Sequence, residues 1–142
     1  MEFLLYLSTQ QMDVYRMVSN KVRVVENAPI CKKYDIFGFY DSAKRVLTMC
    51  TDTLKKFENL HINVNETLMH ESVHVAQSCK TRFTFLDSFG INPSFMPLSY
   101  QKEQDLKKVI TFDSRLKYID REAFWMEDKP EKVKYVLQKY CF

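Results

Sequence analysis

The chain contains very little glycine. Only Gly38 and Gly90 occur among its 142 residues, and they are too far apart to belong to one motif. Phosphate-binding loops such as G-x-x-x-x-G-K and G-x-G-x-x-G need closely spaced glycines, because the backbone must approach the phosphate. The sequence therefore excludes these nucleotide-binding classes and makes long flexible linkers improbable.

Long apolar runs and a strong charge of one sign are also missing. No stretch of about 18 apolar residues is present, so we expect no membrane-spanning helix. The opening MEFLLYLS has an acid at position 2 and a short apolar run, unlike a signal peptide. Lys and Arg number 21 against 18 acids, without a basic run interleaved with aromatics, so we expect no nucleic-acid partner. These absences predict a cytoplasmic protein.

Four cysteines, Cys31, Cys50, Cys79 and Cys141, are widely spread, and none forms a C-x-x-C pair. Their even number permits two disulfides. However, 46% of the residues are hydrophobic, so the core does not require cross-links. We expect free thiols in a reducing cytoplasm.

Aromatic residues are abundant, with 11 Phe and 8 Tyr, which favours a packed globule over disorder. A chain of this length most simply forms one domain, residues 1–142. We predict an α+β fold, with an N-terminal helix and a small antiparallel sheet or hairpin before a mostly helical C-terminal half. The expected elements are a helix at 8–20, a strand or helix end at 22–26, a hairpin turning at 41–44, a helix at 64–80, a loop at 83–98 and helices at 99–112, 115–128 and 129–142.

The motif His70-Glu71-Ser72-Val73-His74 lies within the predicted 64–80 helix. Positions i and i+4 of a helix differ by about 40° and about 6 Å, so His70 and His74 project side by side toward one metal ion. Zinc accepts such nitrogens. Glu71 points about 100° away from His70 and is placed to act as general base on a water. The alternative interpretation is a capped surface helix with an ordinary histidine pair.

A catalytic zinc site needs three protein ligands and a water. His61 is the only other histidine, but it lies just before the predicted helix and would have to fold back. Glu122 is the stronger candidate, because it lies mid-helix on a face shared with apolar residues and would point inward. Asp120 and Glu127 lie on other faces and are interpreted as solvated acids.

These residues resemble the zincin metallopeptidases, and specifically the gluzincins, in which a glutamate on a later helix is the third zinc ligand. The resemblance implies His70, His74 and Glu122 as ligands and Glu71 as base. Residues 64–80 and 116–141 also look like small His-Glu-x-x-His proteins of phage and bacterial genomes. The chain departs from the gluzincin pattern at Arg121, where asparagine is usual, and at Met126, where an acid is usual.

These departures leave open which carboxylate accepts the far N–H of His70, and Asp113 and Asp87 are the two candidates. In zincins an upstream edge strand holds the peptide substrate, and Arg45–Thr51 is placed to be that strand. A Tyr, His or Arg usually stabilises the oxyanion. The candidates for that role are Tyr118, Tyr100, Arg121 and Arg115.

The resemblance implies a zinc-dependent metallopeptidase acting on a peptide or protein. The alternative is a non-catalytic zincin-like module that acts through protein–protein binding. A purely structural zinc site has no need of a base and is closed by a fourth protein ligand. Cys79 lies beyond His74 and off to the side, so closure is not expected, and the presence of Glu71 favours the enzyme.

Overall fold

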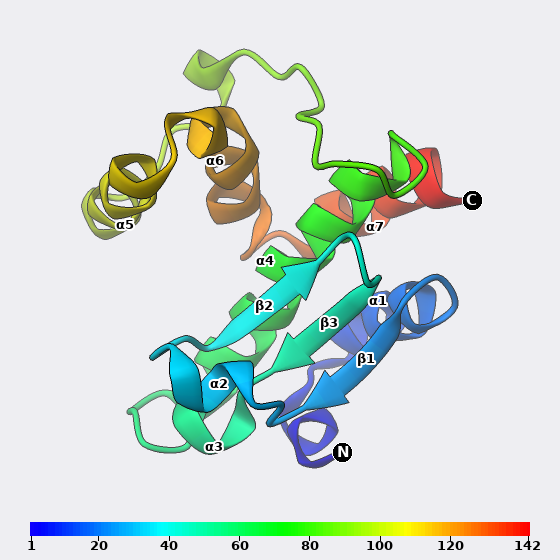
Figure 1. The fold of residues 1–142 in the computed structure, drawn as a ribbon, viewed down its shortest axis with the longest axis vertical. Coiled ribbons are helices and arrows are strands. Elements are labelled where there is room, and N and C mark those ends of the chain that lie inside the picture. Colours follow the sequence, from blue (N-terminus) through cyan, green and yellow to red (C-terminus); the bar gives the residue numbers. More distant parts are fainter.

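The computed structural model describes the backbone of all 142 residues and every side chain except that of Phe112. A small sheet covers one side of a long central helix, and further helices surround the rest of it (Figure 1). The predicted α+β class is confirmed. The elements are η1 (Glu2–Tyr6), α1 (Thr9–Ser19), β1 (Arg23–Glu26), α2 (Ile30–Lys33), β2 (Gly38–Asp41), β3 (Val46–Met49), α3 (Thr51–Leu54), α4 (Leu60–Cys79), η2 (Pro93–Phe95), α5 (Tyr100–Phe112), η3 (Ser114–Leu116), α6 (Lys117–Met126) and α7 (Pro130–Cys141).

The sheet has the strand order β1-β3-β2, so β3 is its central strand. The predicted hairpin is confirmed, because β2 pairs antiparallel with β3 and Asp41 lies opposite Val46. β1 pairs with β3 in parallel. The prediction that Arg45–Thr51 forms a substrate-binding edge is wrong, since β3 is paired on both sides. The edge strands are β1 and β2, and the hairpin turn pairs β2 with β3.

The central helix α4 supplies most of the core. Six of its apolar side chains are fully buried: Val64, Leu68, Met69, Val73, Val75 and Ala76. The helix begins at Leu60, four residues before the predicted start, and its N-cap is Asn59 in the left-handed region at φ 61°. Asn63 lies inside the first turn, where its side-chain amide donates to the carbonyl of Glu58 over 2.9 Å.

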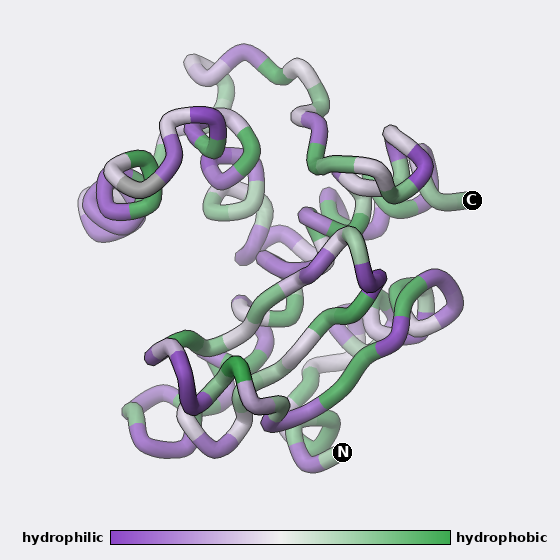
Figure 2. The backbone as a smooth tube through the Cα atoms, in the orientation of Figure 1, coloured by the Kyte–Doolittle hydropathy of each residue, from purple (hydrophilic) through white to green (hydrophobic). Residues whose placement is uncertain are grey.

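Hydropathy follows this arrangement. In Figure 2 the strands carry hydrophobic segments among hydrophilic ones, whereas α5 is largely hydrophilic. Leu106 is the one α5 side chain described as buried. No helix in the described part combines the length and apolar character needed to cross a bilayer.

Gly38 brings the edge strand β2 close to α4. A Cβ at this position would lie 2.7 Å from Thr67 Cγ2, 3.1 Å from the carbonyl oxygen of Thr48 and 3.3 Å from Glu71 Cγ. Only glycine permits this approach without a shift of its neighbours. The scarce glycine therefore positions a strand beside the residue predicted to be the base.

The four cysteines form two disulfides, Cys31–Cys50 and Cys79–Cys141. The prediction of free thiols is wrong, because the tertiary fold brings together residues that are 19 and 62 positions apart. Structural disulfides are typical of proteins in oxidising environments. The free thiols expected of a protein in a reducing cytoplasm are therefore not found.

Replacing Cys79 and Cys141 together by serine is expected to lower the free energy of unfolding by about 4 kcal/mol, because the cross-link closes a long loop of the unfolded chain. Cys31 and Cys50 close a shorter loop, so replacing this pair by serine should lower the free energy of unfolding by about 3 kcal/mol. Urea titration followed by circular dichroism measures both. If both double variants are as stable as the parent chain in the absence of reductant, the disulfides are not structural.

Candidate metal centre

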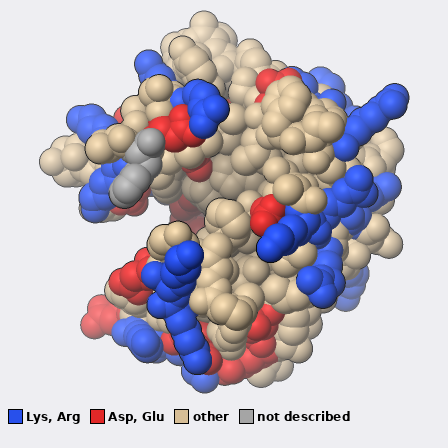
Figure 3. Space-filling view, in the orientation of Figure 1, with Lys and Arg blue, Asp and Glu red and all other residues tan. Residues whose placement is uncertain are grey.

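A hollow lies between β2 and the α5–α6 pair (Figure 3). Figure 3 shows this hollow from the face of Figure 1, with acidic side chains deep inside it. The side chains of His70 and His74 on α4 are only 15% and 10% exposed. α4 contributes His70, Glu71 and His74, whose donor atoms all lie within 4.8 Å of one another. The predicted His-Glu-His group is therefore arranged so that it could hold a metal ion. The opposite face of α4 packs into the core, as expected.

Asp120 of α6 completes the group. Its Oδ1 lies 3.2 Å from His74 Nε2 and 3.5 Å from His70 Nε2. Zinc bonds of about 2.0–2.1 Å in a tetrahedron place neighbouring ligand atoms about 3.3 Å apart. The distances from Asp120 Oδ1 to the two Nε2 atoms are thus close to the spacing of ligand atoms around one ion. Glu71 follows His70 directly and flanks this point, so Asp120 is the better third ligand.

Glu122, the predicted third ligand, is not at this point. Its side chain is buried as expected. However, both of its oxygens accept the backbone N–H of Phe89, over 2.8 and 3.1 Å, and Oε1 also accepts from Gln77 Nε2 over 2.9 Å. The sequence analysis favoured Glu122 because it considered the apolar face of α6. The face that meets the histidines carries Asp120, Ala123 and Glu127, which are spaced at i, i+3 and i+7.

Glu122 orients His74 through Gln77. The amide nitrogen of Gln77 donates to Glu122 and to the carbonyl of Ile119, so its oxygen must face His74, and the Oε1–Nδ1 distance is 2.7 Å. His74 therefore carries hydrogen on Nδ1. Its Nε2 is directed at Asp120, as a metal-binding imidazole requires.

Glu127 performs the same task for His70. Its Oε1 accepts from His70 Nδ1 over 2.9 Å, while Phe124 packs edge-on against the ring with centroids 4.7 Å apart. The predicted partners Asp113 and Asp87 lie elsewhere, since Asp113 pairs with Arg115 and Asp87 pairs with Lys80. The interpretation of Asp120 and Glu127 as solvated acids is wrong.

The carboxylate of Glu66 lies next to that of Glu127. Burial and the neighbouring Glu127 raise the pKa of Glu66 to about 7. Lys102 offsets part of this negative charge, with Nζ 3.6 Å from Glu127 Oε2 and 3.9 Å from Glu66 Oε2. The metal centre is therefore surrounded by more negative than positive charge, which favours a cation.

Without a metal, His70 is protonated and its charge lies where the ion would be. Burial alone would lower the pKa of His70, but hydrogen bonds to Asp120 and Glu127 raise it to about 10. Burial would raise the pKa of Asp120, but the two histidines hold it well below its usual range. A bound cation would replace the proton between the imidazoles and Asp120.

The remaining predicted residues have other partners or are exposed to solvent. His61 is exposed, with Nε2 3.4 Å from Ser8 Oγ, and Cys79 is in a disulfide. Arg121 donates to Met96 O over 3.1 Å and to Glu103, so its guanidinium is engaged elsewhere. Tyr100 is 80% exposed and Tyr118 is 49% exposed. Their role as oxyanion donors stays a prediction.

Glu71 is buried beside Gly38. Among the described residues, no donor is hydrogen-bonded to its carboxylate, in contrast to the carboxylates of Glu122 and Glu127. An unengaged carboxylate next to a candidate metal site is available to accept a proton from water. This arrangement agrees with the predicted base.

The chain matches the model of one protein family, DUF8637, described as a domain of unknown function, over residues 3–142. The chain belongs to this family. No curated protein and no solved structure matches it. The family description carries no function, so the chemistry of the site must be argued from its geometry.

Asp120→Asn is expected to weaken zinc binding by at least about a hundredfold, because one of three ligands loses its charge. Glu122→Gln should weaken zinc binding by about tenfold, since it disturbs the hydrogen bonds to Gln77 and Phe89 but removes none of the three proposed ligands. Competition with a chromophoric chelator measures both. Asp128→Asn is the exposed control on the same segment and should leave the affinity unchanged. The reverse order, with Glu122→Gln the more damaging, would restore the original ligand assignment.

Zinc binding near neutral pH should release at least one proton, because His70 is protonated below a pKa of about 10 in the metal-free protein. The affinity should therefore fall by about tenfold per pH unit for each proton displaced as the pH decreases. Calorimetric titrations in buffers of different ionisation enthalpy count the protons. A zero count at pH 7 would contradict the proton-filled site.

Proposed function

We propose that this protein is a zinc-dependent metallopeptidase whose ligands are His70, His74 and Asp120 and whose general base is Glu71. The single observation that supports it best is the convergence of two Nε2 atoms and one carboxylate oxygen at ligand spacing. A second is that each Nδ1 faces an acceptor, which leaves each Nε2 for the metal.

Three protein ligands leave one zinc position open, as in catalytic sites and unlike closed structural ones. A zinc ion held there would supply a Lewis acid for a carbonyl and lower the pKa of water. Glu71 would accept a proton from the attacking water and return it to the leaving amine. Glu127 and Gln77 would keep the two imidazoles in place during these steps.

The substrate we propose is an extended peptide lying along β2. This strand is at the edge of the sheet, so its outer backbone groups have no strand partner in the described sheet. Gly38 sets the strand against Glu71. A peptide added to this edge would pair through its backbone and pass the metal ligands across the hollow.

Glu71→Gln should reduce hydrolysis of a mixed fluorogenic peptide library by about 10²–10⁴-fold, because the base is lost while the metal ligands remain. Zinc content, measured by atomic absorption, should not change. Glu58→Gln, at an exposed position before α4, is the matched control and should retain full activity.

Two outcomes would count against this function. Equal hydrolysis by the parent chain and Glu71→Gln would contradict the proposed hydrolase activity, even if zinc is bound. Absence of zinc binding by the parent chain would remove both the metal centre and the peptidase.

A further inference from the structure

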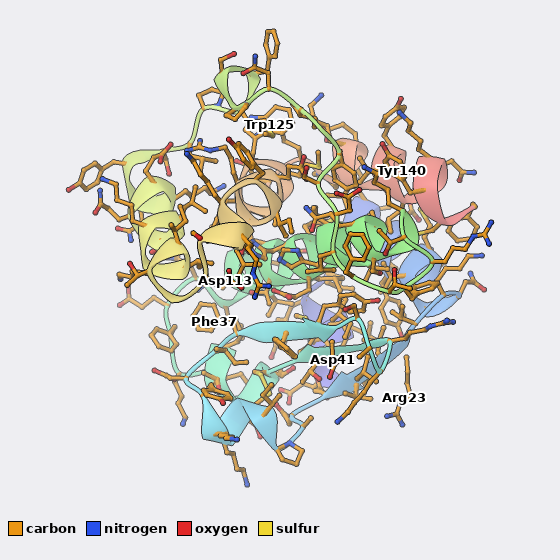
Figure 4. The ribbon with its side chains drawn as sticks, turned by 45° about the horizontal axis from the view of Figure 1, so that its top comes forward. Arg23, Phe37, Asp41, Asp113, Trp125 and Tyr140 are labelled. Carbon is orange, nitrogen blue, oxygen red and sulfur yellow. A yellow bond between two sulfur atoms is a disulfide. The ribbon has the colours of Figure 1, made fainter. Side chains whose placement is uncertain are left out.

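A second hollow lies between α6, α7 and the loop that follows α4. Its volume is about 480 Å³, within the usual range of small-ligand pockets. The rings of Phe89, Trp125, Tyr135 and Tyr140 form much of its wall. Figure 4 labels Trp125 and Tyr140, which come from α6 and α7. None of these residues belongs to the metal centre.

Two lysines border this groove. Lys132 and Lys139 are seven residues apart on α7, which places them on one side of the helix and about 10 Å apart along it. Lys132 Nζ lies 5.3 Å from the ring centroid of Trp125, and Lys139 Nζ lies 5.3 Å from that of Tyr140. Neither lysine forms an ion pair with a described side chain, so both ammonium groups are available to a ligand.

Contacts within and beside its wall fix the shape of the groove. The backbone N–H of Phe89 is fixed by Glu122, and its ring stacks on Tyr140 with centroids 5.2 Å apart. Lys80 Nζ donates to the carbonyl of Ser88 over 2.6 Å. The Cys79–Cys141 disulfide joins the ends of α4 and α7 beside it. A preformed wall lowers the ordering cost of binding.

We propose that this groove binds an amphipathic carboxylate, with an apolar alkyl or aryl body among the rings and its carboxylate between Lys132 and Lys139. Apolar walls favour burial of an apolar body. The lysines favour a negative head group and repel a cation, because Glu131 is the only acid among the lining residues. This inference does not rest on the proposed peptidase.

Trp125 is the only tryptophan of the chain, so its fluorescence reports directly on this groove. Octanoate should change its emission in a saturable way, and octanamide, which has the same body without charge, should bind about tenfold more weakly. N-acetylphenylalanine tests whether the carboxylate belongs to a peptide C-terminus. If N-acetylphenylalanine binds more tightly than octanoate, the natural ligand is a peptide C-terminus. If it binds more weakly, the natural ligand is a free carboxylic acid.

Replacing Lys132 and Lys139 together by glutamine should weaken octanoate binding by about tenfold, because exposed charge pairs are partly screened by solvent. Lys134→Gln is the control on the same helix, since Lys134 Nζ instead pairs with Asp13 over 3.0 Å. Circular dichroism confirms that the variants fold. The proposal is overturned by no saturable response to octanoate, by equal binding of octanamide, or by an effect of Lys134→Gln as large as that of the double variant.

Discussion

The packing of α6 across α4 is the contact on which the candidate site depends. It sets a carboxylate oxygen of Asp120 between the Nε2 atoms of His70 and His74. The small side chain of Ala123, fully buried at the same face, permits the close approach of the two helices. Without this crossing, α4 would carry two adjacent imidazoles and no third ligand.

The same crossing supplies the groups that orient the ligands. Glu127 lies two turns after Asp120 and reaches His70, while Glu122, on the neighbouring face, reaches His74 through Gln77. Burying a carboxylate costs free energy unless it is hydrogen-bonded, and both Glu127 and Glu122 accept hydrogen bonds. Glu122 also fixes Phe89, so one side chain stabilises both a metal ligand and the wall of the second groove.

Much of the fold was accessible from local signals. The hairpin followed from the turn at residues 41–44, and the C-terminal helices followed from helical periodicity. The strand order was not accessible, because β1 and β3 are brought together by the whole chain. The disulfides were missed for a similar reason, since a long separation in sequence contains no information about proximity.

By itself the sequence determined the pair His70 and His74, the adjacent Glu71 and the helix that carries them, because a regular helix fixes the relation of residues four apart. Only the tertiary structure places Asp120, and not Glu122, beside the two histidines. The two acids lie two residues apart on one helix, on different faces, and apolar periodicity predicted which face would be buried. It did not predict which buried face would meet the histidines, because that depends on the angle and rotation of α6 against α4.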